Sequence, residues 1–303
     1  MVGNAQHGYP VLASDLTIEY PAHGPSPAYV AVRGLNLSVK PGEVLGLLGE
    51  SGSGKSTIAK VLAGRFLSAP RGAVHPVITG GDAQVFGESL RRLSRRHADR
   101  LMFEVGYVGQ EASETLRADH TVAEIVAEPI LLRDRHYNRK ALEARVVTMV
   151  DAVRLPLGSL GRYPYELSTG QRQRLAIARA LVLEPALLIA DEPTAAIDAV
   201  VRHAIIDLIS ELQEHTAFSA MVISHDLAIL RRIADRIAVL QGGMLVGLGP
   251  IEEVLANPLH PYVERLAAEL PEDSVAREAP VLRGIDGVPK PPRMLPHPRR
   301  PAV

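Results

Sequence analysis

The sequence has no cysteine and no tryptophan among its 303 residues, and aromatic residues make up only 4% of it. Without cysteine the chain has no disulfide, no thiolate metal site, no iron–sulfur cluster and no cysteine nucleophile. It also lacks an apolar run close to the roughly 18 residues that a membrane-spanning helix needs. Its most apolar stretch, residues 180–190, is interrupted by Glu184 and Pro185.

An excess of either charge is missing as well, since 33 Lys+Arg against 34 Asp+Glu leave a net charge of -1. A protein held on nucleic acid by its overall field needs a strong positive excess, so we expect no nucleic-acid partner. Residues 1–25 have neither the basic start nor the apolar centre of a secretory signal. Hydrophobic residues make up 47%. We therefore expect a soluble, intracellular, globular protein.

Hydrophobic periodicity predicts strands that alternate with helices. Alternation favours an edge strand over residues 11–20 and a second strand near 35–39. Short apolar runs favour buried strands at 43–48, 186–190 and 220–224. Helical patterns cover residues 56–67 and 139–155. This order is typical of an α/β protein with a mostly parallel sheet.

Residues 91–100 hold five arginines: Arg91, Arg92, Arg95, Arg96 and Arg100. We interpret them mainly as a solvated helix face. Contact with lipid headgroups or with a partner at a membrane surface is the alternative.

A glycine-rich segment between the buried strand at 43–48 and the next helix fits the phosphate-binding pattern G-x-x-x-x-G-K-[ST]. Its residues are Gly49, Glu50, Ser51, Gly52, Ser53, Gly54, Lys55, Ser56 and Thr57. Glycines let successive backbone N–H groups point at phosphate oxygens, and the helix N-terminus adds partial positive charge. Lys55 would reach the β- and γ-phosphates, and the Ser56 hydroxyl would bind Mg²⁺. By itself the segment leaves kinases, GTPases, motors and ATPases open.

The sequence LSTGQ at residues 167–171 narrows this choice. With it, the chain resembles the nucleotide-binding subunits of ABC (ATP-binding cassette) proteins, whose signature is usually LSGGQ. Thr169 departs from the signature, whereas Ser168, Gly170 and Gln171 match it. The resemblance implies a head-to-tail dimer, because Ser168 and Gly170 of one subunit would complete the phosphate site at Lys55 of the other.

The resemblance also implies roles for residues that are unspecific by themselves. Asp191, at the end of a buried strand, would hold Mg²⁺ through water, and Glu192 would orient or deprotonate the attacking water. Gln110 matches the Q-loop residue that links Mg²⁺ and water to the transport partner. His225 matches the switch histidine that senses the γ-phosphate. Asp198 is retained in the D-loop, although the common Ser-Ala-Leu before it is replaced.

One aromatic side chain is expected to stack on adenine. We predict Tyr20, because it ends the first strand before the phosphate-binding segment. Tyr29 is the alternative, since the Pro/Gly-rich loop between the two leaves the alignment open. Ordinary edge packing is the other reading of either tyrosine.

The resemblance covers residues from about 10 to about 270 and implies a fold class. This is α/β, a P-loop ABC-type nucleotide-binding domain with a parallel-sheet ATP-binding core, an antiparallel β subdomain and a helical subdomain, followed by a C-terminal extension. We expect the ABC ATPase domain at 1–250, with its helical subdomain near 112–182. The extension at 251–303 would end in a Pro-rich basic tail, which we expect to be poorly ordered.

Segments at 121–129, 249–254 and 257–262 resemble the oligopeptide, dipeptide and nickel import branch of this family. The resemblance implies an ATPase subunit of an importer for peptides or similar small solutes, with ATP and Mg²⁺ as its cofactors. Its partners would be a second ABC ATPase subunit, the same chain or another, and transmembrane permease subunits. An extracytoplasmic solute-binding protein would act indirectly. The chain would be cytoplasmic and peripheral on the inner face of the cell membrane.

Three alternatives stay open at this point. The first is an ABC-type subunit of a soluble enzyme assembly, such as a phosphonate carbon–phosphorus lyase system. The second, a nucleic-acid-associated ABC ATPase, is disfavoured by the net charge. The third is a catalytically weak partner in an asymmetric dimer, suggested by Thr169 and the altered D-loop. Because Lys55, Asp191, Glu192 and His225 are all present, we expect activity.

Overall fold

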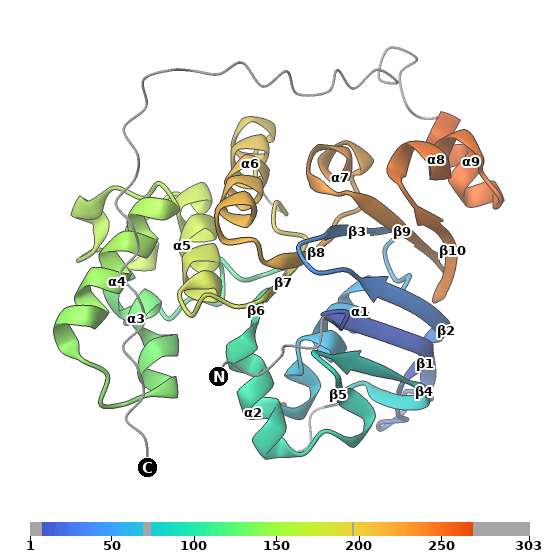
Figure 1. The fold of residues 1–303 in the computed structure, drawn as a ribbon, viewed down its shortest axis with the longest axis horizontal. Helices are drawn as coiled ribbons and strands as arrows, with labels where there is room; N and C mark the ends of the chain where they lie inside the picture. The colour runs from blue at the N-terminus through green and yellow to red at the C-terminus, as the bar shows by residue number, and fades with distance from the viewer. Residues whose placement is uncertain (1–7, 69–73, 196, 269–303) are drawn as a thin grey trace. The chain divides into compact units, whose positions relative to one another are not determined.

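The computed structural model describes residues 8–68, 74–195 and 197–268, and the predicted Pro-rich tail lies outside these ranges. All described residues fall within one compact unit. Two β-sheets with helices packed around them make up this unit (Figure 1).

The larger sheet has six strands in the order β10-β9-β3-β8-β7-β6. Its strands are β3 (Val44–Gly49), β6 (Val105–Val108), β7 (Leu187–Asp191), β8 (Ser219–Ile223), β9 (Arg236–Gln241) and β10 (Met244–Gly249). All neighbours pair in parallel except β10, which runs antiparallel to β9. Every residue of β3, β7 and β8 is buried, so the predicted buried strands and parallel sheet are confirmed.

The smaller sheet is antiparallel, with the order β2-β1-β4-β5. Its strands are β1 (Val11–Tyr20), β2 (Tyr29–Val39), β4 (Val77–Val85) and β5 (Glu88–Ser89). The prediction of an edge strand over residues 11–20 is wrong, because β1 pairs with both β2 and β4. Alternation shows that one face of a strand is buried, but it carries no information about how many of its edges are paired.

Nine α-helices are assigned within the described residues. They are α1 (Lys55–Leu62), α2 (Arg95–Glu104), α3 (Val122–Arg133), α4 (Arg139–Ala152), α5 (Thr169–Leu181), α6 (Ala199–Thr216), α7 (Leu227–Ile233), α8 (Ile251–Ala256) and α9 (Pro261–Ala268). Short 3-10 turns cover Arg65–Ser68, Leu90–Arg92, Leu157–Ser159 and Pro164–Glu166. No helix among the described residues is long and apolar enough to cross a membrane.

The helix predicted at 56–67 ends earlier, at Leu62, because Gly64 follows with φ +68° and the chain turns there. In Figure 1 α6 and α7 lie above the six-stranded sheet and α1 lies below it. Helices α3, α4 and α5 contact one another beside β6, within the range expected for the helical subdomain. The arginines at 96 and 100 are exposed on α2, as expected for a solvated helix face.

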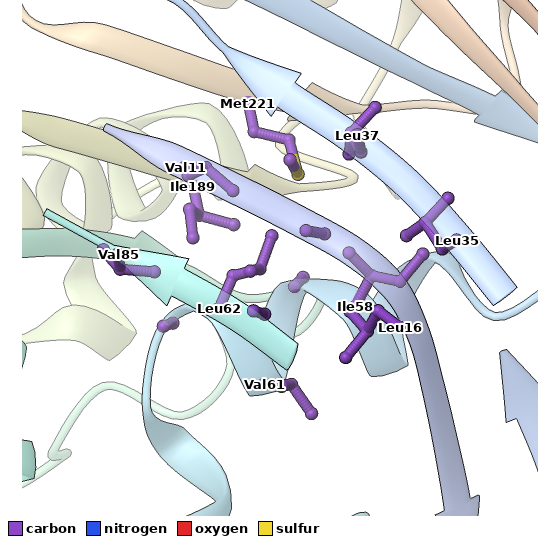
Figure 2. Packing of buried hydrophobic residues seen from close by; sticks show 14 of the residues in the cluster. Val11, Leu16, Leu35, Leu37, Ile58, Val61, Leu62, Val85, Ile189 and Met221 are labelled. Atoms are coloured by element: carbon purple, nitrogen blue, oxygen red, sulfur yellow. The ribbon is translucent and has the colours of Figure 1, made fainter. Parts of the chain in front are cut away.

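The hydrophobic core joins the two sheets through α1 (Figure 2). Ile58, Val61 and Leu62 of α1 are at most 1% exposed and pack with residues of β1, β2 and β4 on one side. Ile189 of β7 and Met221 of β8 belong to the same cluster. The loop that leads into α1 is therefore held between two rigid layers, which positions the site described next.

Helices α8 and α9 follow β10 and pack against it. Tyr262 and Val263 of α9 are buried. The division of the chain at residue 250 stays a prediction.

Candidate functional site

The phosphate-binding segment forms the loop between β3 and α1. Its path depends on Gly54, where φ is +99° and a Cβ atom would lie 2.5 Å from the carbonyl oxygen of Ala31. Any other residue would clash there and adopt a strained backbone. The loop leads directly into the first turn of α1 at Lys55, whose backbone N–H groups have no partner within the helix.

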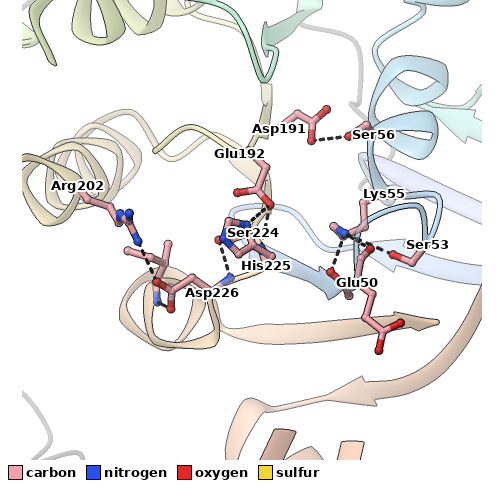
Figure 3. Close-up of polar contacts among 12 residues, drawn as sticks. Glu50, Ser53, Lys55, Ser56, Asp191, Glu192, Arg202, Ser224, His225 and Asp226 are labelled. Atoms are coloured by element: carbon pink, nitrogen blue, oxygen red, sulfur yellow. Dashed lines mark hydrogen bonds and ion pairs between the residues drawn. The ribbon is translucent and has the colours of Figure 1, made fainter. Parts of the chain in front are cut away.

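The Lys55 ammonium lies within this loop (Figure 3). Its Nζ atom donates to the carbonyl oxygens of Gly49 and Glu50, at 2.7 Å in each case. Burial lowers the pKa of Lys55, and the negative charge of Glu192 is the largest influence opposing that shift. The loop thus holds the Lys55 ammonium beside backbone that, because of its glycines, has no side chains to block an anionic group.

Asp191 is the last residue of β7, and it is only 1% exposed. Its Oδ1 atom accepts a hydrogen bond from the Ser56 hydroxyl at 3.1 Å. Burial raises the pKa of Asp191, whereas the hydrogen bond from Ser56 acts in the opposite direction. A hydroxyl oxygen and a carboxylate oxygen therefore lie side by side at the start of α1.

Glu192 directly follows β7 in a left-handed backbone conformation, with φ +50°. Its backbone N–H donates to the carbonyl oxygen of Ile223 on β8, which fixes the turn. Its Oε1 atom accepts the backbone N–H of His225 at 2.9 Å and also lies 2.9 Å from the Nδ1 atom of that ring (Figure 3). The side chain of Glu192 is 11% exposed and that of His225 is 71% exposed. The two residues therefore form a fixed acid–imidazole pair.

These side chains surround a cavity of about 320 Å³. It is lined by Tyr29, Ala31, Ser51, Gly52, Gly54, Lys55, Ser56, Thr57, Gln110, Glu192, Ala195 and His225. The structure thus brings most of the residues predicted for nucleotide binding and hydrolysis to one place. Asp191 joins them through its bond to Ser56.

The two tyrosines considered for base stacking differ in position. Tyr29 lines the cavity and is 53% exposed. Tyr20 is not among the lining residues; it packs against the hydrophobic core, and its hydroxyl lies 3.4 Å from Thr57 Oγ1. The geometry favours the alternative, Tyr29, over our prediction of Tyr20.

The signature residues lie elsewhere on the described chain, since none of residues 167–171 lines the cavity. Ser168 caps α5: its hydroxyl accepts the Gln171 N–H at 3.2 Å, and Gln171 Oε1 accepts the Ser168 N–H at 2.9 Å. Arg172 donates to the hydroxyl of Thr169 at 3.2 Å. This bond fixes Thr169, the residue that departs from the usual signature, in the first turn of α5. A Cβ atom on Gly170 would lie 2.7 Å from Val201 of α6.

Asp198 is exposed and lies outside the cavity as well. Its Oδ1 atom accepts the Val201 N–H at 3.0 Å at the start of α6. The sequence interpretation missed two residues nearby, Arg202 and Asp226, which form an ion pair of 3.3 Å. Asp226 was detectable, because an Asp directly before an apolar helical run is a typical N-cap.

A larger groove of about 530 Å³ adjoins Gln110. It is lined by residues of α2, β6, α3 and α5, together with the loop after β6. Two of its lining residues are in contact, since the guanidinium of Arg65 lies 5.4 Å from the ring centroid of Tyr107. Burial raises the pKa of Tyr107, so this phenol stays neutral. Leu132 on the rim is 64% exposed.

Comparisons with known proteins agree with this geometry. A family model described as "ABC transporter" matches residues 32–195. The oligopeptide transport ATP-binding protein OppD of Mycobacterium tuberculosis is 38% identical over 248 residues, which is 82% of this chain and 38% of that protein. OppF of Salmonella typhimurium, also an oligopeptide transport ATP-binding protein, is 36% identical over 241 residues, covering 80% of this chain and 69% of OppF. The chain thus spans less than half the length of OppD.

Among solved structures, the ATP-binding cassette MJ0796, a dimer bound to ADP and Pi, superimposes with a TM-score of 0.69. It is 26% identical, and the match covers 79% of this chain and 98% of that one. The two sheets and the phosphate-binding loop described above fit this likeness. By its family match and its relatives, the chain belongs to the ABC transporter family.

Proposed function

We propose that this chain is the ATP-hydrolysing subunit of an ABC importer for peptides or similar small solutes. The observation that carries the proposal is the cavity in which the Lys55 loop meets the Glu192–His225 pair. The relatives named as oligopeptide transport ATP-binding proteins support the importer role.

The triphosphate binds to the loop of residues 49–57. Backbone N–H groups of the loop and of the first turn of α1 hydrogen-bond the phosphate oxygens, and Lys55 exchanges its carbonyl partners for the β- and γ-phosphates. Tyr29, exposed at the rim, stacks on the adenine ring.

The donor set near Ser56 fits Mg²⁺. Ser56 Oγ and the carboxylate of Asp191 are 3.1 Å apart, and Gln110 lines the same cavity. Hydroxyl, carboxylate and amide oxygens are the ligands that this hard cation prefers. No group of three or more His, Asp or Glu suited to a metal occurs within the described ranges, which agrees with an ion held mainly by phosphate oxygens and water. When bound, the ion neutralises charge on the β- and γ-phosphates.

Glu192 is the general base. It accepts a proton from water as the water oxygen attacks the γ-phosphorus, the bond to the β–γ bridging oxygen breaks, and ADP and inorganic phosphate are the products. His225 holds the carboxylate through two contacts at 2.9 Å. Such a fixed base loses little free energy to reorganisation.

A second ABC ATPase subunit completes the site. Ser168 and Gly170 lie outside the cavity of their own chain, and the backbone N–H of Gly170, in the first turn of α5, suits an anion. We infer that they contact the γ-phosphate at Lys55 of a partner subunit in a head-to-tail dimer. The dimeric form of the cassette MJ0796 supports an assembly of two such subunits.

Permease subunits dock in the groove beside Gln110. The groove is continuous with the Q-loop segment at Gly109 and Glu111, so movement of a docked segment reaches the hydrolytic site. The chain would act on the cytoplasmic face of the membrane, as a peripheral subunit. The extracytoplasmic binding protein contributes only indirectly.

Co-purification from native membranes tests the proposal. A tagged chain, extracted with a mild detergent, is expected to retain permease subunits and to reveal whether a second ATPase accompanies it. Recovery of soluble metabolic enzymes or of ribosomal particles, without any membrane protein, would contradict the importer role and leave the ATP site intact.

A further inference from the structure

Arg202, near the start of α6, contacts two segments that border the hydrolytic site. One of its terminal nitrogens lies 3.3 Å from Asp226 Oδ2, and the other donates to the carbonyl oxygen of Ile197 at 3.4 Å. Ile197 directly precedes Asp198 of the D-loop, and Asp226 directly follows His225. One guanidinium therefore bridges the D-loop and the His225 segment, and Figure 3 shows its contact with Asp226.

The segment that carries His225 is fixed on both sides of that residue. Asp226 Oδ1 caps α7 by accepting the Ala228 N–H at 2.9 Å, and the Asp226 N–H donates to Ser224 Oγ at 3.1 Å. Between these anchors, His225 directs its backbone N–H and Nδ1 at Glu192 Oε1. A change at Asp226 is thus transmitted to the base through one residue.

We propose that Arg202 is a positioning residue for hydrolysis: by joining Ile197 to Asp226 it keeps His225 against Glu192 and links that pair to the D-loop. The effect of Arg202 on hydrolysis rests on the proposed ATPase function. The effect of Arg202 on the position of His225 is independent of that function.

The residue type supports this role. The Arg202 and Asp226 side chains are each 33% exposed, so solvent screens their charges less than those of a fully exposed pair. The Nε atom of Arg202 is buried and has no hydrogen-bond partner in the part of the chain that the structure describes. A guanidinium presents a fork that reaches a carboxylate and a carbonyl together, which a lysine ammonium does not.

The chain offers a matched control in Arg232 of α7, which pairs with Asp207 of α6. This ion pair joins the same two helices, and the Nη2 atom of Arg232 lies 2.8 Å from Asp207 Oδ2. Its side chains are more exposed, at 50% and 37%, and neither residue lines the cavity. Removing it costs a helix–helix ion pair without touching His225.

The test compares Arg202→Met, Arg202→Lys and Arg232→Met by two measurements. The first is hydrogen exchange of the His225 amide, followed by NMR on the purified chain. The second is steady-state ATP hydrolysis by the complex that co-purifies with the chain. We expect Arg202→Met to speed exchange at His225 about tenfold and to lower kcat about tenfold, with KM within about twofold of wild type. Arg202→Lys should show a smaller change of the same kind, and Arg232→Met none.

The inference is overturned if Arg202→Met and Arg232→Met behave alike, or if Arg202→Lys keeps wild-type values, since charge alone would then suffice. If the complex that co-purifies with the wild-type chain hydrolyses no ATP, the proposed function fails, and exchange at His225 alone decides the positioning role.

Discussion

A single carboxylate oxygen, Oε1 of Glu192, contacts both the backbone N–H and the Nδ1 atom of His225 at 2.9 Å. Because a carboxylate only accepts hydrogen bonds, the ring contact requires the proton on Nδ1. The second ring nitrogen, Nε2, is then left for a substrate group or for water. A largely buried acid is thus oriented by a mostly exposed ring that lines the cavity.

The position of Tyr29 predicts that it, and not Tyr20, contributes to base binding. Tyr29→Ala should weaken ATP binding by about 1–3 kcal/mol, the usual value of one base–aromatic stack. Tyr29→Phe should retain affinity, because the ring is kept. Titration with a fluorescent ATP analogue measures both.

Tyr20→Ala is the control for this pair, because Tyr20 packs behind the loop against the core. It should lower thermal stability while leaving affinity close to wild type. A larger affinity loss for Tyr20→Ala than for Tyr29→Ala would reverse the assignment.

Burial of Asp191 predicts a conflict between stability and function. Because its pKa is raised in the folded state, folding favours the protonated form. The resulting penalty is therefore complete above the folded pKa, and it vanishes as pH falls below the unfolded value of 3.8. Asp191→Asn, which keeps an acceptor for Ser56, should raise the Tm of the metal-free and nucleotide-free chain at pH 7.

Each kcal/mol gained in this way corresponds to roughly 2–4 °C for a domain of this size class. Calorimetry at pH 7 and at a mildly acidic pH measures the gain, which should shrink at the lower pH. The same variant should lose Mg²⁺-dependent hydrolysis. An unchanged or lower Tm at pH 7 would show that the charge of Asp191 is compensated in the folded chain.

Gly54 should tolerate no side chain. Gly54→Ala places a Cβ atom 2.5 Å from the Ala31 carbonyl oxygen and imposes φ +99° on alanine. We expect a loss of at least about 1 kcal/mol in unfolding free energy, together with loss of ATP binding. Gly161→Ala, where no heavy atom lies within 4 Å of the added Cβ, is the matched control and should change neither. Urea unfolding of both variants checks the difference.

If permease subunits dock in the groove beside Gln110, a substitution in that groove should weaken docking and leave ATP hydrolysis unchanged. Leu132 lines this groove, is 64% exposed and does not line the hydrolytic cavity. Leu132→Asp should keep stability within about 0.5 kcal/mol and should keep basal ATP hydrolysis. It should reduce the amount of permease that co-purifies, since a buried unpaired charge opposes docking. Full permease recovery would place the docking surface elsewhere.

Much of this fold was predictable, because its strongest signals are local. Uninterrupted apolar runs gave the buried strands β3, β7 and β8, and the loop before Lys55 followed from its glycines and its place between strand and helix. These patterns depend on residues close in sequence, so they can be recognised without any knowledge of tertiary contacts.

The features that were missed depend on distant contacts. The internal position of β1 is set by pairing with β4, which begins at Val77. Tyr29 reaches the cavity because β2 runs beside the loop, and Arg202 meets Asp226 only through the packing of α6 on α7. Periodicity and motif spacing contain no information about such pairings.

Hydrolysis by Glu192→Gln tests the central claim most directly. The substitution keeps the size of the side chain and an acceptor oxygen for His225, but it removes the base. We expect kcat to fall by about 10²–10⁴-fold while the affinity for Mg²⁺–ATP stays within about threefold of wild type. Both values come from one preparation, by phosphate release and by equilibrium ATP binding. Hydrolysis at the wild-type rate, or loss of ATP binding instead of turnover, would contradict the account.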